Sequence, residues 1–194
     1  TARCAAALSN ATMIKLKLGG EQDLECVAAV RSALPDTPLF VDVNAGWTLD
    51  RLNRLAPRLA DAGIFMIEQP LPPQDDHLLD DYNRAVPLCA DESCHDRTDL
   101  PRLKGRFDYV NIKLDKAGGL TEALALAEAA RQQDFRIMVG CMLGTGIAMA
   151  PAYLIASLSE VVDLDAPLIV KDVAHIGVRH DGRLLHRFES SLWG

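Results

Sequence analysis

Five short apolar runs of the sequence each end in an ionisable residue, and the spacing between these residues is nearly regular. Consecutive members are separated by 25, 26, 23 and 22 residues. A charge at the end of a buried strand is costly unless it is paired, hydrogen-bonded or bound to a metal, so one such residue alone would indicate only a salt bridge. The repetition indicates a shared site formed by Lys17, Asp42, Glu68, Asp91 and Lys113.

The three acidic members of this set have the chemistry of a metal site. Carboxylate oxygens are hard ligands that suit Mg²⁺, and no His or Cys stands where it could join them and favour zinc. The sequence therefore predicts that Asp42, Glu68 and Asp91 bind Mg²⁺, with Mn²⁺ as the alternative ion. Asn44 and Glu92 adjoin these acids, and we expect them to orient the acids through hydrogen bonds.

The two basic members, Lys17 and Lys113, indicate proton transfer. They end runs that are four steps apart, and in an eight-stranded ring four steps lead to the opposite side. Two opposed bases around one carbon allow a 1,1-proton transfer, in which one base removes the α-proton and the other returns a proton to the opposite face. Because the α-proton of a carboxylate is very weakly acidic, the metal is expected to stabilise the enediolate that forms.

Lys15 precedes Lys17 by two residues, so both side chains are expected on the same side of one strand. The positive charge of Lys15 should then make Lys17 a better base, because a neighbouring cation disfavours the protonated amine.

The elements that must position these residues form a repeating pattern of short apolar runs and helix-like segments. A strand-plus-helix unit repeated seven times is typical of a parallel α/β fold, and seven units suggest a barrel of eight with one missing. In such a barrel the carboxyl ends of the strands meet at the face that holds the active site. The predicted strands are Met13–Lys17, Leu39–Asp42, Phe65–Glu68, Pro87–Asp91, Tyr109–Lys113, Arg136–Gly140 and Val161–Asp165.

The segments between these strands show helical spacing of apolar residues or helix-capping signals. Thr48 is a plausible N-cap, and Gly63 follows the end of the helix that it would begin. The helices expected from these signals are the end of a helix at Thr1–Ala11, then Glu21–Leu34, Thr48–Ala62, a short acidic helix at Asp75–Asn83, and Leu120–Gln133.

Composition excludes several classes of partner. The chain has 194 residues, a net charge of −7, 49% hydrophobic residues and 24% charged residues, as expected of one globular domain. The negative charge disfavours nucleic acid and anionic membrane surfaces. The charge-free stretch from Ile137 to Ser159 is not expected to span a membrane, because Pro151 interrupts it and it coincides with a strand, a turn and a helix of the repeat.

The cysteines and the beginning of the sequence bear on location. The five cysteines form an odd number and include no C-x-x-C pair, which favours reduced thiols in the cytoplasm. No basic-then-apolar leader is seen, which also favours a cytoplasmic protein.

The motifs at the strand ends resemble those of the enolase superfamily in order and spacing. They read IKLK at Ile14–Lys17, VDVN at Val41–Asn44, IEQP at Ile67–Pro70, ADES at Ala90–Ser93 and NIK at Asn111–Lys113. The K-x-K pair and the late lysine are similar to those of the muconate-lactonizing subgroup. The resemblance implies a TIM-type (β/α)7β barrel, with residues 1–194 as a catalytic barrel domain that lacks the family's N-terminal capping domain and first strand.

Within that subgroup the sequence is similar to dipeptide epimerases of the L-Ala-D/L-Glu type. The similarity lies in Asn111–Gly119, in Gly140–Leu143 and in an Asp-x-Asp pair. The resemblance implies that Asp163 and Asp165 of this pair bind the α-ammonium group of the substrate. Two departures concern the pocket: Ala166 stands before Pro167 where the family usually has glycine, and Gly144 stands where many relatives have glutamate.

The sequence thus predicts a Mg²⁺-dependent enzyme that inverts the α-carbon of the C-terminal residue of a small dipeptide substrate. One alternative is another enzyme of the subgroup, a cycloisomerase or an o-succinylbenzoate synthase, whose substrates lack an ammonium group. A second alternative is a non-catalytic metal-binding remnant. Without a capping domain, weak or no activity is expected of these residues alone. The sequence leaves open a homo-oligomer and a second chain that supplies the capping segment.

Overall fold

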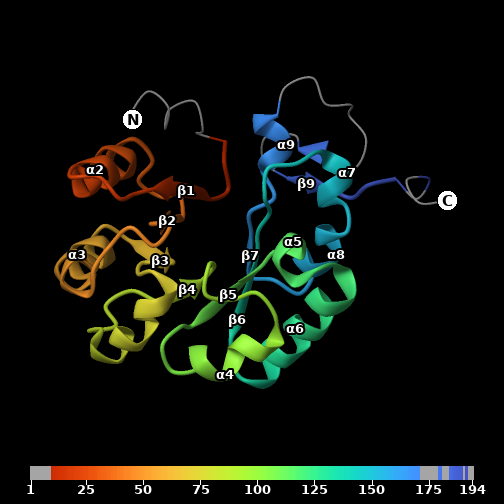
Figure 1. Ribbon diagram of the computed structural model, residues 1–194. Coiled ribbons are helices and arrows are strands. Elements are labelled where there is room, and N and C mark those ends of the chain that lie inside the picture. The colour runs from red at the N-terminus through yellow and green to blue at the C-terminus, as the bar shows by residue number, and fades with distance from the viewer. Residues whose placement is uncertain (1–9, 171–178, 181–183, 190, 192–194) are drawn as a thin grey trace. The chain divides into compact units, whose positions relative to one another are not determined.

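The computed structural model describes residues 10–170, 179–180, 184–189 and 191 (Figure 1). Strands and helices alternate along this part of the chain. The chain divides into two compact units, the first comprising Thr1–Ser93 with Gly105–Asp108 and the second comprising Cys94–Lys104 with Tyr109–Gly194. The predicted helix end at Thr1–Ala11 falls mostly on residues outside the described ranges.

The first unit contains four parallel strands that pair in chain order. They are β1 (Ile14–Lys17), β2 (Leu39–Asp42), β3 (Ile64–Glu68) and β4 (Leu88–Ala90). The register places Lys17 opposite Asp42 and Asp42 opposite Glu68. Because parallel strands all run the same way, the polar residues that end them lie along one edge of the sheet. The interiors of β2, β3 and β4 are apolar and almost entirely buried, as expected of a sheet covered on both faces, whereas β1 carries Lys15 and is only partly buried.

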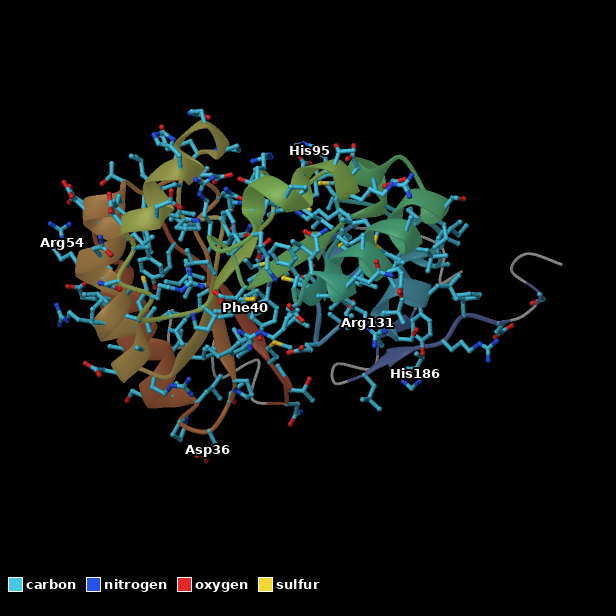
Figure 2. The ribbon with its side chains drawn as sticks, turned by 90° about the horizontal axis from the view of Figure 1, so that it is seen from below. Asp36, Phe40, Arg54, His95, Arg131 and His186 are labelled. Carbon is cyan, nitrogen blue, oxygen red and sulfur yellow. The ribbon has the colours of Figure 1, made fainter. Side chains whose placement is uncertain are left out.

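Three helical segments connect these strands: α2 (Asp23–Ala33), α3 (Leu49–Asp61) and the 3₁₀ helix η1 (Pro73–Asp81). The hydroxyl of Thr48 caps α3 by accepting from the backbone N–H of Arg51 at 3.3 Å. Figure 2 shows Arg54 on the outer face of α3, pointing into solvent, whereas Phe40 of β2 lies in the interior. The ring of Phe40 packs against that of Phe65, with centroids 5.7 Å apart.

The second unit contains three parallel strands and a series of helices. The strands β5 (Tyr109–Ile112), β6 (Arg136–Val139) and β7 (Val161–Val162) pair in this order. A two-stranded antiparallel pair follows, β8 (Arg179–His180) with β9 (Leu185–His186). The helices are η2 (Arg97–Asp99), α4 (Leu100–Leu103), α5 (Leu114–Ala117), α6 (Leu120–Gln132), α7 (Gly146–Met149), α8 (Ala152–Ala156) and α9 (Ala166–Ile169).

The seven predicted strands are all present, and the long helices occur where their spacing predicted them. The acidic helix predicted at Asp75–Asn83 is instead a 3₁₀ helix that begins at Pro73. A short helix, α5, follows Lys113 directly and ends at Gly118, whose φ of 80° is favourable only for glycine. The sequence did not predict this helix.

The last predicted strand, Val161–Asp165, was too long. β7 ends at Val162, although the backbone N–H of Asp163 still donates to the carbonyl of Val139 at 2.8 Å. Asp165 has helical backbone angles and is the N-cap of α9, which carries Pro167 in its first turn. Proline is favourable there because it has no N–H to satisfy, so the chain turns into a helix before the strand can continue.

None of the helices among the described residues is long and apolar enough to cross a membrane. The charge-free stretch from Ile137 to Ser159 is divided among β6, α7 and α8, as the repeat predicted.

Candidate active site

The three predicted metal ligands lie in the first unit at the carboxyl ends of adjacent strands. Asp42 is the last residue of β2, Glu68 is the last residue of β3, and Asp91 follows β4 directly. Their exposed fractions are 1%, 0% and 3%. Three carboxylates buried side by side require a compensating positive charge.

Lys15 and Lys17 supply positive charge to this cluster. The Lys15 amine lies 2.9 Å from Oδ2 of Asp42 and 2.8 Å from Oε2 of Glu68. The Lys17 amine lies 2.5 Å from the same Asp42 oxygen and donates to Oδ1 of Asn44 at 2.7 Å. The two lysines therefore reach the same carboxylate, although the Lys15 side chain is 17% exposed and that of Lys17 is 62% exposed.

Asn44 and Glu92 form a polar chain beside the ligands. The backbone N–H of Asn44 donates to Oδ1 of Asp42 at 2.9 Å. The Asn44 side-chain amide donates to Oε1 of Glu92 at 3.2 Å. Asn44 reaches these partners with a φ of 46°, a left-handed conformation that asparagine tolerates better than most residues. Asp42 is thus held on one oxygen by a backbone donor and on the other by two amines.

Gln69 and Ser93 join the ends of β3 and β4, and the sequence analysis assigned neither of them a role. The Gln69 side chain is fully buried. Its Oε1 accepts from the backbone N–H groups of Asp91 at 2.8 Å and Ser93 at 3.1 Å. Its Nε2 donates to the carbonyl of Leu71 at 2.9 Å and to the Ser93 hydroxyl at 2.7 Å. One amide therefore fixes the segments that carry Glu68 and Asp91 relative to each other.

The charge balance of the cluster is visible at Glu68. The pKa of this carboxyl is raised to about 7 as the net result of several causes: burial raises it most, the Lys15 ammonium lowers it, and the carboxylates of Asp42 and Asp91 raise it. The positive charge of Lys15 is therefore not sufficient to keep all the acids ionised near neutral pH. An additional cation at this edge would be electrostatically favourable.

The donor set fits a hard divalent cation. Asp42, Glu68 and Asp91 offer carboxylate oxygens on one strand edge, and Mg²⁺ prefers such oxygen ligands. Within the described part of the chain, no three His, Cys, Asp or Glu side chains are drawn together as a ready metal cluster. The Lys15 amine instead lies between Asp42 and Glu68, so a cation bound there would share the two carboxylates with Lys15 or displace its amine.

The remaining predicted site residues, Lys113, Asp163 and Asp165, belong to the second unit, and all three influence the thiol of Cys141 electrostatically. Burial raises the pKa of the Cys141 thiol; the carboxylates of Asp163 and Asp165 raise it further, and the Lys113 ammonium lowers it. The thiol also donates to the backbone carbonyl of Asp163 at 3.4 Å. Lys113, Asp163 and Asp165 therefore lie near one thiol, which the sequence analysis did not single out.

The predicted strand Val161–Asp165 would place Asp163 and Asp165 on the same face, because alternate residues of a strand point the same way, and this expectation is wrong. Both residues follow β7, and Asp165 is helical, so the alternation of side chains along a strand does not relate them. Their grouping depends on the turn into α9. The position of Lys113 across a ring from Lys17 stays a prediction.

Comparison with known proteins places this site in context. Residues 1–180 match the family model described as enolase C-terminal domain-like. The chain is 43% identical over 189 residues to an N-acetyl-D-glutamate racemase of Pseudoalteromonas sp, covering 97% of this chain and 60% of that protein. It is 48% identical over 159 residues to the L-Ala-D/L-Glu epimerase of Escherichia coli, covering 82% of this chain and 50% of that protein.

Solved structures show the same fold. An enolase family member from Agrobacterium tumefaciens, with homology to dipeptide epimerases and with bound sodium and L-Ala-L-Glu, is 41% identical and has a TM-score of 0.95, covering all of this chain and 59% of that one. A dipeptide epimerase from Cytophaga hutchinsonii, complexed with Mg and D-Ala-L-Val, is 28% identical and has a TM-score of 0.85, covering 92% of this chain and 52% of that one. The predicted fold class is confirmed. The chain spans 50–60% of the length of the two curated relatives.

The Gln69 amide generates a first prediction. Gln69→Leu should lower the free energy of unfolding by about 3 kcal/mol or more, because it leaves several buried backbone groups without a partner and each costs roughly 1–3 kcal/mol. Urea denaturation would measure the change. Gln74→Leu, on the exposed side of η1, is the matched control and should change stability by less than about 0.5 kcal/mol. Equal effects of the two substitutions would contradict the role of Gln69.

The raised pKa of Glu68 generates a second prediction. Below pH 7 this carboxyl holds a proton that Mg²⁺ must displace, so the affinity for Mg²⁺ should fall as the pH decreases, approaching about tenfold per pH unit. Above pH 7 it should level off. Isothermal titration calorimetry between pH 5.5 and 8.5 would measure this profile. Glu68→Gln should weaken binding and remove the step near pH 7, and a flat profile in the unmodified protein would contradict the assignment.

Proposed function

The chain belongs to the enolase C-terminal domain-like family, and on that premise we propose that it carries the catalytic residues of a Mg²⁺-dependent dipeptide epimerase. The observation that carries the proposal is the buried edge of three carboxylates with two lysine amines held against it. Burial of acids and bases together is costly for stability, and such clusters are concentrated at functional sites.

In the proposed reaction Lys17 and Lys113 are the two acid/bases. One amine removes the α-proton from the C-terminal residue of the dipeptide, and the other ammonium delivers a proton to the opposite face, so the centre is inverted. Lys15 places a second positive charge beside Lys17, since both amines contact the same oxygen of Asp42. Asp42, Glu68 and Asp91 would hold Mg²⁺. When bound, this ion supplies positive charge that stabilises the negative charge developing on the substrate carboxylate.

The proposed substrate is L-Ala-D/L-Glu or a similar dipeptide. Asp163 and Asp165 would bind its α-ammonium group, since two carboxylates suit one ammonium. Both carboxylates influence the Cys141 thiol, which Lys113 also influences, and this supports the role because it puts negative charge in the same part of the second unit as the proposed base. The printed names of the Escherichia coli relative and of the Agrobacterium tumefaciens structure support the same substrate class.

A second candidate is racemisation of an N-acylated glutamate. It is favoured by the Pseudoalteromonas relative, which is 43% identical over 97% of this chain. The two candidates share the metal and the two-base chemistry, because both reactions invert the carbon next to a carboxylate. They differ at the other end of the substrate, where an acetyl group carries no ammonium for Asp163 and Asp165 to bind.

Domain organisation, ion identity, assembly and location complete the proposal. The 194 residues would form the barrel domain and act together with a capping domain. Mn²⁺ is the alternative ion for the same site, because it also binds oxygen ligands. A homo-oligomer and a cytoplasmic location remain predictions, the latter supported by the four cysteines among the described residues, whose thiols are reduced.

Proton NMR in D₂O tests the proposed function directly. In protein in which the barrel domain is joined to a capping domain, with Mg²⁺ and L-Ala-L-Glu, the Glu α-proton signal should disappear while the L,D diastereomer appears, since each inversion places a solvent deuteron on the α-carbon. Lys113→Ala should abolish inversion. Lys116→Ala is the matched control on α5 and should retain it. Inversion that persists in Lys113→Ala, or exchange in neither the unmodified protein nor the control, would contradict the proposal.

A substitution that removes the charge of Asp163 but keeps its shape separates the two candidate substrates. Asp163→Asn should reduce kcat/KM for L-Ala-D-Glu about 10- to 100-fold, because a hydrogen bond to a charged group contributes roughly 1.5–3 kcal/mol. It should leave turnover of N-acetyl-D-glutamate nearly unchanged. A steady-state assay with both compounds measures the ratio. Faster turnover of N-acetyl-D-glutamate by the unmodified protein, with no effect of Asp163→Asn on either compound, would favour the second candidate.

A further inference from the structure

Asp23, the first residue of α2, is a buried carboxylate to which the reaction proposed above assigns no part. It is 4% exposed and accepts four hydrogen bonds. Oδ1 accepts from the backbone N–H groups of Gly19 at 2.9 Å and Gly20 at 3.0 Å. Oδ2 accepts from the indole N–H of Trp47 at 3.2 Å and from the Arg51 guanidinium at 2.9 Å. The donors come from two different loops and from α3.

The first of these loops follows Lys17 directly. Leu18 extends the β1 ladder by donating its backbone N–H to the carbonyl of Asp42 at 2.9 Å. Gly19 then adopts a φ of 133°, which suits glycine, and with Gly20 turns its N–H groups toward Asp23. Asp23 therefore fixes the direction in which the chain leaves the catalytic strand.

The second loop carries Asn44, the residue that accepts a hydrogen bond from the Lys17 amine at 2.7 Å. Asn44 and Ala45 have φ angles of 46° and 59°, so this loop holds two non-glycine residues in the left-handed region. Such backbone is strained and persists only when its surroundings hold it. Trp47 provides an anchor: it is 2% exposed, its backbone N–H donates to the carbonyl of Pro70 at 3.0 Å, and its indole donates to Asp23.

Arg51 closes the network. Its guanidinium donates to Asp23 and to the carbonyl of Gly20, and it lies 5.8 Å from the ring centroid of Trp47. The charge of Asp23 is thus neutralised locally, and both loops are fixed to one carboxylate. This matters for Lys17 because its side chain is 62% exposed, so packing does not determine where its amine lies.

We propose that Asp23 is a positioning residue for Lys17, acting through the loop that follows Lys17 and the loop that carries its acceptor Asn44. The proposal rests on the proposed role of Lys17 as one of two acid/bases. In Asp23→Asn the remaining oxygen accepts from only one loop. The new amide N–H₂ faces either the two glycine N–H groups or the Trp47 and Arg51 donors, and donors cannot bind donors. One loop is released, and the Lys17 amine loses its defined position.

The two-base reaction provides a quantity that general destabilisation would not change, namely the ratio of the exchange rates of the two epimers. Lys17 removes the α-proton of one epimer and Lys113 that of the other, so a displaced Lys17 should slow hydrogen–deuterium exchange of one epimer only. We expect Asp23→Asn to change the ratio of the exchange rates of L-Ala-L-Glu and L-Ala-D-Glu by about tenfold or more, about 1.4 kcal/mol. Lys17→Ala and Lys113→Ala identify which epimer depends on which base.

Asp50→Asn is the matched control, since Asp50 is an exposed acid in the first turn of α3. It should leave both exchange rates unchanged. An equal decrease for both epimers in Asp23→Asn would overturn the proposal, because it would show loss of folded enzyme rather than displacement of one base.

A second measurement needs no turnover. Mass spectrometry can follow the labelling of lysines by an amine-reactive reagent in the folded, unliganded protein. Asp23→Asn should increase the labelling rate of Lys17 several-fold, because its amine is released from Asp42 and Asn44, and should leave Lys104 unchanged. Unchanged labelling of Lys17 would overturn the proposal. If the unmodified protein exchanges neither epimer, the proposed function fails, and the labelling experiment still decides whether Asp23 positions Lys17.

Discussion

The mutual repulsion of three buried carboxylates at one sheet edge is the constraint on which the rest of the site depends. Asp42 and Glu68 stand opposite each other in the strand register and are almost completely buried. Lys15 bridges them, yet the pKa of Glu68 remains at about 7, because burial and the neighbouring acids outweigh one ammonium. Additional positive charge at this edge would therefore stabilise the folded chain. If the acids had no function, replacing them by apolar residues would increase the stability of the fold.

Parallel pairing of the strands explains why the charged side chains gather at this edge. Hydrogen bonds in the loops explain why these side chains have a defined geometry. The β1, β2 and β3 register aligns Lys17, Asp42 and Glu68 without any contribution from the side chains themselves. Alignment alone leaves each side chain free to rotate. Gln69 binds the segment after β4 to the segment after β3, and Asp23 binds the loop after β1 to the loop after β2. The strands place the charges, and these two side chains restrict how the loops hold them.

The sequence contained enough information to predict the strands, the long helices and the carboxylate edge, because each depends on local signals. An apolar run that ends in a charge can be recognised without its partners. Gln69 and Asp23 could not be recognised in this way, since their roles depend on donors far along the chain, the backbone N–H groups of Asp91 and Ser93 for Gln69 and the indole N–H of Trp47 for Asp23. The loop that carries Trp47 passes through the left-handed residues Asn44 and Ala45, and Gln69 is itself left-handed, so no glycine marks these turns in the sequence. Asp165 shows the opposite case: Pro167 was a readable signal for a helix start, and the strand prediction overlooked it.

The charges of the two units, each considered by itself, agree with a substrate that has both a negative and a positive end. The first unit gathers acids whose repulsion lysines and a metal cation can offset, and in the proposed function that cation would attract the substrate carboxylate. In the second unit Asp163, Asp165 and Lys113 all influence one thiol, and in the proposed function the two carboxylates would bind the substrate ammonium. A dipeptide has these two ends, whereas an N-acylated amino acid has only the first. The distinction between the two candidate substrates therefore depends on whether the carboxylates that follow β7 are used.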